Sequence, residues 1–317
     1  MNEAGVYQLG SLLAIGALTM NAHLTHSLLL AAPDSESRIT INAPPQHEVI
    51  RRFLEQISSE VLHRLEEKAG LSLRQSVTVS IAPSEEEMDR VAPSEFRWPR
   101  WAIGFAFGDR NQVILRTTDL DSLGNQGVLQ VFTHEMAHIL LHQINSQPIP
   151  RWFNEGLALW VANAWAFEDT YTYSYLLLTE GYIPLQELST SFPASEQRAR
   201  MAYMESLFFL SSLVDSYGAE VVPTIVKGLD AGRSFEEAFQ QATGLTSWEV
   251  EARWRRRVQF LYKWVPFLSS SAFLWMLITA LVTLGYLKKK RRARAMIQRW
   301  EEDERLQSAP GMKERME

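Results

Sequence analysis

Hydrophobic and polar residues follow two different periods in the first third of the chain. Between residues 46 and 69, apolar side chains recur every three or four positions, which predicts an amphipathic helix that ends at Gly70. Residues 76–81 alternate with a period of two, as a half-buried strand does. Two further strand patterns, 103–107 and 112–116, are joined by a Gly-Asp-Arg-Asn turn, which predicts a hairpin.

Helical patterns dominate the rest of the chain up to residue 263. The apolar runs that predict helices cover residues 128–141, 157–166, 203–217, 221–229, 234–243 and 247–263. We find no internal repeat. A few strands followed by many helices predict an α+β domain, which we place at residues 34–262.

A long uncharged stretch follows this domain. Residues 264–287 carry no charge, which is enough to cross a bilayer as one helix, and Trp264 and Tyr286 lie at its ends, where aromatic belts sit. The basic block 288–292 comes next, so we expect the tail 288–317 to be cytoplasmic and the domain to face outward from the cell membrane. A weaker set of basic residues precedes the stretch: Arg253, Arg255, Arg256, Arg257 and Lys263.

The first 33 residues are apolar and almost uncharged. The run 9–20 has the length of the central part of an export signal, and small residues at positions 31 and 32 could follow a cleavage site. No Lys or Arg precedes Arg38, so the usual basic start of such a signal is missing. We favour an export signal, with an uncleaved anchor and a buried helix as the alternatives.

The composition of the chain argues against some classes of partner and of metal site. The chain has 317 residues and a net charge of −6, which gives no indication of a nucleic-acid partner. It contains no cysteine, so disulfides and thiolate metal sites are excluded.

The apolar run around residue 134 contains a metal-binding pattern. His134 and His138 are separated by one helical turn, so both imidazoles can reach one metal ion. Glu135 lies between them, where it can act as a base on a water without being a ligand. The pattern predicts a catalytic zinc site with one ion per chain.

A third ligand is available seventeen residues later. Glu155 lies in the sequence Trp-Phe-Asn-Glu-Gly-Leu-Ala, and two prolines, Pro148 and Pro150, separate this segment from the first helix. A helix, a turn and a second helix would bring Glu155 back against the histidine pair. Two imidazoles, one carboxylate and one open position form the arrangement of catalytic zinc, whereas structural zinc takes four protein ligands.

These two segments resemble those of the gluzincin metallopeptidases. The second segment is similar to that of the M1 aminopeptidase-like branch of the peptidase MA clan, and the layout matches over about residues 75–260. The resemblance implies a thermolysin-like catalytic domain in which His134, His138 and Glu155 bind zinc and Glu135 is the general base. It also implies a tyrosine that hydrogen-bonds the oxyanion, and Tyr203 matches that position.

The resemblance also predicts where a substrate binds. In gluzincins a strand before the zinc helix pairs with the substrate backbone, and we assign this role to Gly104, Phe105 and Ala106, with an interior hairpin as the alternative. M1 aminopeptidases carry a glutamate near this strand that holds the substrate amino terminus, and the stretch 102–108 has no acid at the matching place. Their large C-terminal helical domain is absent as well. We therefore expect an endopeptidase.

Other metal-site classes fit less well. Metzincins need Gly and His three and six residues after the second histidine, where this chain has Leu141 and Ile144. His142 is a further step along the same helical face, and we interpret it as a helix-end residue or a partner of a ligand.

The sequence thus predicts a membrane-anchored zinc peptidase whose partners are a peptide or protein substrate and the lipid bilayer. The main alternative is a catalytically inactive module, tethered to the membrane, that binds a peptide or an envelope partner on the same fold. A weaker alternative is a zinc hydrolase that acts on a non-peptide amide. Loss of hydrolysis in a chelator and its return with zinc would separate the peptidase from the inactive module.

Overall fold

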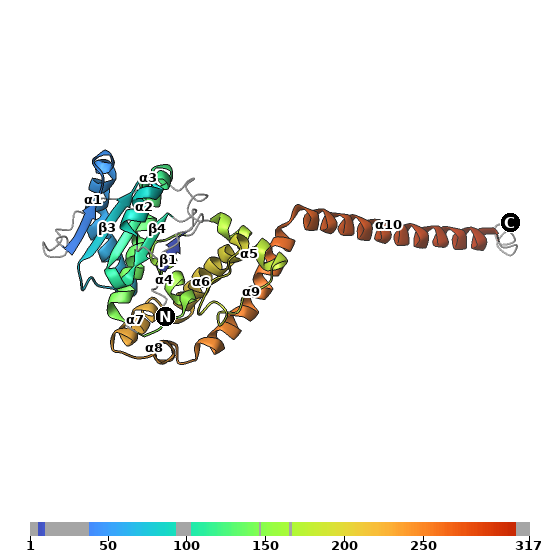
Figure 1. Cartoon of the computed structure of the whole chain (residues 1–317). Coiled ribbons are helices and arrows are strands. Elements are labelled where there is room, and N and C mark those ends of the chain that lie inside the picture. Colours follow the sequence, from blue (N-terminus) through green and yellow to red (C-terminus); the bar gives the residue numbers. More distant parts are fainter. Residues whose placement is uncertain (1–5, 10–37, 93–102, 146, 165–166, 309–317) are drawn as a thin grey trace, which may run out of the picture. The chain divides into compact units, whose positions relative to one another are not determined.

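The structure is a computed structural model that describes residues 6–9, 38–92, 103–145, 147–164 and 167–308 (Figure 1). The chain divides into two compact units, Met1–Gln259 and Phe260–Glu317. The first unit is mostly helical, and its helices are α1 (Glu48–Ala69), α2 (Glu85–Val91), α3 (Thr117–Ile144), α4 (Arg151–Val161), α5 (Phe167–Thr179), α6 (Glu196–Tyr217), α7 (Val221–Asp230), α8 (Phe235–Thr243) and the start of α9 (Ser247–Ser269).

A small mixed sheet completes the first unit. Its strands are β1 (Val6–Leu9), β2 (Ile39–Asn42), β3 (Val77–Ala82), β4 (Gly104–Phe107) and β5 (Gln112–Arg116), in the order β1-β4-β5-β3-β2. The pairs β1/β4 and β4/β5 are antiparallel, and β5/β3 and β3/β2 are parallel. The mixture of a small sheet and many helices agrees with the α+β prediction.

The predicted hairpin is present. Strands β4 and β5 pair from Gly104 opposite Leu115 to Phe107 opposite Gln112. Asn111 closes the turn with φ of 48°, a left-handed conformation that asparagine tolerates. The pattern of alternating residues did not reveal β2, nor β1, which lies within the segment interpreted as an export signal.

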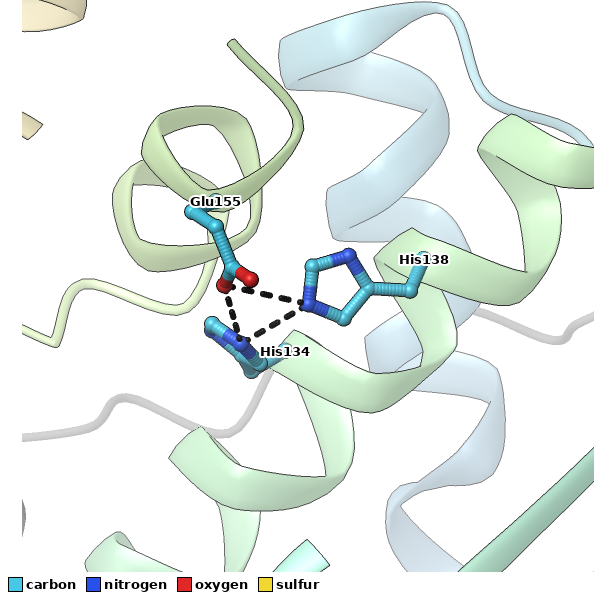
Figure 2. Close-up of side chains that lie close together, drawn as sticks. All are labelled: His134, His138 and Glu155. Atoms are coloured by element: carbon cyan, nitrogen blue, oxygen red, sulfur yellow. Dashed lines mark hydrogen bonds and ion pairs between the residues drawn. The ribbon is translucent and has the colours of Figure 1, made fainter. Parts of the chain in front are cut away.

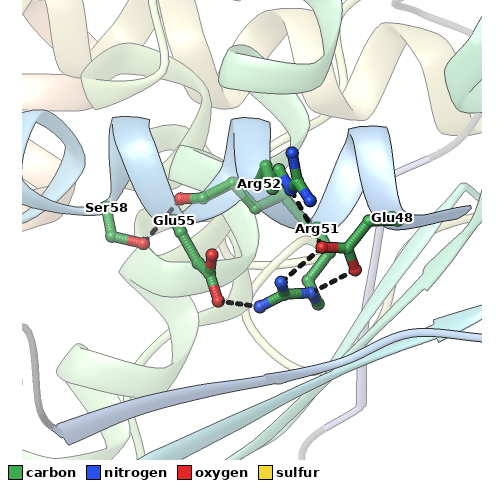
Figure 3. A network of polar contacts seen from close by, with 6 residues as sticks. Glu48, Arg51, Arg52, Glu55 and Ser58 are labelled. Carbon is green, nitrogen blue, oxygen red and sulfur yellow. Dashed lines mark hydrogen bonds and ion pairs between the residues drawn. The ribbon is translucent and has the colours of Figure 1, made fainter. Parts of the chain in front are cut away.

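Helix α1 has the two faces that its sequence predicts. Leu54, Val61 and Leu65 are fully buried, and Gly70 ends the helix in the left-handed conformation with φ of 69°. On the polar face, Arg51 and Arg52 both donate to Glu48, at 2.6 and 2.9 Å (Figure 3). These hydrogen bonds lower the pKa of Glu48 to about 2.

Helix α3 is the central element of the first unit. It contacts α1 and α4 as well as the strands β4 and β5, and every residue from 131 to 141 is buried. The helix begins earlier than the predicted residue 128, at Thr117, but Gly124 interrupts its helical geometry with φ of 62° and ψ of 179°. The burial of residues 131–141 on all sides explains why this part of the helix has no polar face.

Helices α4 and α6 make the most extensive contact between any two elements. Their backbones approach closely at Gly156, where an added Cβ would lie 2.6 Å from the carbonyl oxygen of Ser206. Aromatic rings continue this contact toward α8 and α9: Trp152 lies edge-on to Phe209 at 5.1 Å and to Phe235 at 5.5 Å, and Phe209 lies 5.2 Å from Trp254. The second half of the unit is therefore packed around α4.

The second unit contains α10 (Ser271–Ser308) and the end of α9. Among the described residues, α10 is the one helix that is long and apolar enough to cross a membrane. The predicted span 264–287 is divided between α9 and α10 at Ser270, so the uninterrupted helix begins seven residues later than predicted. The predicted export signal lies largely outside the described residues, and strand β1 is the described part of it.

The close contact at Gly156 predicts that Gly156→Ala lowers stability. The added methyl group would meet backbone atoms of Ser206, which cannot rotate away, so we expect a loss of about 1–3 kcal/mol in the free energy of unfolding. Denaturant unfolding measures the loss. Gly285→Ala is the control, because nothing lies within 4 Å of a Cβ at that position. Equal stability of the two variants would contradict the packing described for α4 and α6.

Candidate metal centre

Helices α3 and α4 bring three potential ligands together (Figure 2). His134 and His138 lie one turn apart on α3, with their Nε2 atoms 2.9 Å from each other. The Oε2 atom of Glu155, on α4, lies 3.7 Å from Nε2 of His134 and 3.6 Å from Nε2 of His138. All three side chains are fully buried.

The donor set fits a metal ion of the zinc type. One ligand atom from each residue lies within 4.8 Å of the others. Four ligands arranged tetrahedrally at bond lengths of about 2.1 Å have neighbouring atoms about 3.4 Å apart, which is close to the separations found here. Burial lowers the pKa of His138 to about 3 and that of His134 well below its ordinary value, so both imidazoles are neutral, the form that binds metals.

Asn154 orients one of these imidazoles. The Nδ1 atom of His138 lies 2.7 Å from the side-chain oxygen of Asn154. Because that oxygen accepts a hydrogen bond, Nδ1 carries the proton and the lone pair of Nε2 faces the ligand group. This is the usual arrangement for a histidine that ligates a metal, in which the second ring nitrogen donates to a fixed acceptor.

Glu135 lies beside the ligand group and has no compensating contact of its own. It is fully buried, and among the described residues neither of its oxygens has a hydrogen-bond partner. Burial, and next the charge of Glu155, raises the pKa of Glu135 well above its ordinary value. A buried carboxyl group without partners is costly, and a cation bound by the neighbouring ligand group would offset this cost.

Strand β4 borders Glu135 on one side. At Gly104 an added Cβ would lie 2.6 Å from Oε1 of Glu135, so a residue with a side chain would collide with the carboxyl group. The absence of a side chain at this position therefore leaves room for Glu135 next to the sheet.

Tyr203 reaches the site from α6. Its side chain is 4% exposed, and burial raises its pKa well above the ordinary value. Among the charged groups that act on this pKa are Glu155 and Glu135, which raise it, and Arg151, which lowers it. Electrostatic interactions thus connect the tyrosine with Glu155 and with Glu135, and its oxyanion role stays a prediction.

Comparison with known proteins identifies the family. The model of the Peptidase MA superfamily matches residues 57–260, which include His134, His138, Glu155 and Tyr203. The chain belongs to this superfamily. Membership supports a metal-dependent peptidase and does not distinguish the M1 aminopeptidase-like branch from others.

A relative is known from Bacillus subtilis (strain 168). The protein described as "Uncharacterized protein YhcO" is 25% identical over 190 residues, which is 55% of each chain. The match thus spans about half the length of that protein, and its name assigns no activity.

The structure separates the other candidate residues from the ligand group. His142 is not part of that group, because its Nε2 atom lies 3.1 Å from a carboxylate oxygen of Asp109 at the end of the hairpin, and both side chains are partly exposed. Gly104, Phe105 and Ala106 form most of β4 and are buried. The outer edge of β4 is paired with β1, from Val6 opposite Phe107 to Leu9 opposite Gly104.

Two neighbours of the ligands were not assigned a role from the sequence. The side-chain oxygen of Asn154 accepts a hydrogen bond from Nδ1 of His138, a contact that the sequence pattern did not indicate. Arg151 precedes Glu155 by four residues, and its Nε atom lies 3.5 Å from Oε1 of Glu155. The spacing of one helical turn between Arg151 and Glu155 is the signal that could have revealed this pair.

A second buried carboxyl group, Glu205, lies two residues after Tyr203 on α6. Its oxygens accept the backbone N–H of Ile183 at 3.1 and 3.3 Å. Burial raises its pKa to about 9, the Ile183 N–H opposes this, and Glu251 adds to it. The group is therefore protonated in the folded protein at neutral pH and ties α6 to the segment that follows α5.

Glu205 predicts a pH dependence of stability. Its pKa is higher in the folded chain than the ordinary 4.5, so unfolding releases a proton, and the free energy of unfolding falls as the pH rises from about 4.5 to about 9. In Glu205→Gln, the part of this decrease in the free energy of unfolding that Glu205 causes should disappear. Thermal unfolding of both forms between pH 5 and pH 9 checks it, with the exposed Glu220→Gln as control. Parallel curves for the wild type and Glu205→Gln would refute the assignment.

Proposed function

We propose that this protein is a zinc-dependent peptidase that hydrolyses peptide bonds. The observation that carries the proposal is the convergence of His134, His138 and Glu155 on one point, with the buried acid Glu135 beside them. Membership of the Peptidase MA superfamily supports a peptidase over other metal-dependent hydrolases. The donor set supports zinc as the metal, since two imidazoles and one carboxylate are the ligands of many catalytic zinc sites.

Each residue of the site has its own role in the proposed reaction. Zinc, when bound by His134, His138 and Glu155, supplies the positive charge that acidifies a water and polarises a carbonyl group. Glu135 takes the proton of the attacking water and passes it to the leaving amine. Tyr203 donates a hydrogen bond to the carbonyl oxygen as negative charge develops on it. Because all of these side chains are buried, their interactions act in a medium of low polarity.

Strand β4 is the proposed binding place for the substrate backbone. It contacts Glu135 at Gly104, so a peptide that pairs with the outer edge of β4 would run past the general base. In the structure, β1 holds this edge. Substrate binding therefore requires that β1 leaves, and β1 acts as an internal competitor. The lack of an acid at positions 102–108 favours an endopeptidase of the gluzincin type.

We further propose that the peptidase is anchored in the cell membrane by α10. The helix is apolar over its first part and strongly basic from Lys288 to Arg292. The positive block favours a cytoplasmic tail, so the catalytic unit would act on the outer side of the membrane.

The role of Glu135 predicts that Glu135→Gln separates metal binding from hydrolysis. The amide keeps the size of the side chain but cannot accept the proton, so zinc content should stay at the wild-type level while the rate of peptide hydrolysis falls by about 100-fold or more. Metal analysis and a fluorogenic peptide assay measure the two properties. Glu220→Gln, at an exposed position, is the control. Hydrolysis at the wild-type rate in Glu135→Gln would rule out this base.

The pairing of β1 with β4 predicts that a chain without residues 2–9 is more active. Removal of β1 frees the edge of β4, so the KM for a peptide substrate should fall, with little change in kcat. The control is a deletion of equal length at the other end, residues 310–317, assayed in the same detergent. An unchanged KM in the first deletion, with activity retained, would show that β1 does not compete with the substrate.

A further inference from the structure

Arg151 is the first residue of α4 and lies one turn before the third ligand. Its side chain is 26% exposed and that of Glu155 is fully buried, so the guanidinium group extends from the surface toward the ligand. Its Nε atom is 3.5 Å from Oε1 of Glu155, whereas the two imidazoles face Oε2. The two oxygens of this carboxylate therefore have different neighbours: one faces the ligand group and the other faces a cation.

The same guanidinium group contacts Tyr203. A hydrogen bond with Arg151 and the charge of Arg151 both oppose the effect of burial on the phenol. The side chain of Arg151 also lies over the ring of Phe192, at 5.0 Å, and this ring in turn lies edge-on to Tyr203 at 4.9 Å. Arg151, Tyr203 and Phe192 thus form one contact group beside Glu155.

The backbone around Arg151 is fixed as well. Its N–H donates to the carbonyl oxygen of Ser189 at 2.9 Å, and the N–H of Trp152 donates to that of Leu188 at 3.1 Å. These bonds satisfy two of the N–H groups that a helix start leaves without internal partners. The main chain of Arg151 is therefore fixed at the start of α4, and the contact with Phe192 restricts its side chain.

We propose that Arg151 is a positioning residue that fixes which oxygen of Glu155 faces the metal and where the hydroxyl group of Tyr203 lies. A planar guanidinium group can bind two partners at a set angle, which an ammonium group cannot do. The inference rests on the proposed function for the role of Tyr203, but its effect on metal binding does not depend on hydrolysis.

The sign of the effect on metal affinity distinguishes this role from a simple charge effect. A cation near the site repels a metal ion, so on charge alone the loss of Arg151 should tighten zinc binding. If Arg151 positions Glu155, its loss releases a buried carboxylate from its fixed orientation and weakens binding. Loss of a partner that orients a ligand typically reduces metal affinity about 10- to 100-fold.

The test compares Arg151→Met and Arg151→Lys with the wild type in the full-length protein. Competition with a chromogenic chelator gives the zinc dissociation constant, and we expect it to rise about tenfold or more in Arg151→Met. In Arg151→Lys, which keeps the charge, it should rise by a smaller factor. Unchanged or tighter zinc binding in Arg151→Met would overturn the proposal, as would full recovery of the wild-type value in Arg151→Lys.

Two controls separate positioning from general damage. Arg74→Met removes another arginine that pairs with an acid, Asp230 at 2.6 Å, at a partly exposed position outside the site, and it should leave zinc binding unchanged. Thermal unfolding of the metal-free proteins shows whether Arg151→Met still folds. If it does not fold, Arg151→Lys alone decides, through its zinc affinity.

The contact between Arg151 and Tyr203 can be tested separately, through the effects of substitutions on kcat. Arg151→Met should lower kcat with little change in KM, and Tyr203→Phe should lower kcat much less in the Arg151→Met background than in the wild type. Independent effects of the two substitutions on kcat would contradict the link between Arg151 and Tyr203. If no form hydrolyses peptides, the proposed function fails, while the zinc measurements still decide the role of Arg151 toward Glu155.

Discussion

The structure depends on one electrostatic constraint, the burial of four ionisable side chains at one point. His134, Glu135, His138 and Glu155 have no exposed surface, and Glu135 has no hydrogen-bond partner among the described residues. Without a cation, burial forces the histidines to be neutral and favours protonated carboxyl groups, at a cost in stability. A bound divalent ion would instead favour the charged form of the two carboxyl groups. The same residues that make the metal-free site unfavourable are thus a group that could hold a metal ion.

The fold meets this constraint by placing the site in the middle of the first unit. Helix α3 packs against α1, α4 and the sheet, and its residues 131–141 are buried, so His134, Glu135 and His138 have no access to solvent. The close approach of α4 and α6 at Gly156 then brings Glu155 and Tyr203 from two helices to the same place. Arg151 and Asn154 both precede Glu155 on α4. Asn154 contacts His138 and Arg151 contacts Tyr203, so one short helix organises most of the site.

The sequence predicted what is set by local spacing. One helical turn between His134 and His138 defines the pair, and the alternation in residues 103–116 defines the β4/β5 hairpin. Glu155 followed from its sequence context together with a family resemblance. The contacts of Asn154 and Arg151 depend on the angle at which the chain returns after residue 144, which spacing alone does not fix. Strand β1 depends on pairing with a strand about 100 residues away, and four residues carry no such information.

The measurement that tests this account most directly is the zinc content of the purified protein, for the wild type and for Glu155→Ala. The account predicts about one zinc per chain in the wild type and a large loss in the variant, because the remaining imidazole pair provides too few ligands for tight binding. Absence of zinc from the wild type after incubation with the metal, or equal zinc in both proteins, would contradict the three-residue site on which the proposed peptidase rests.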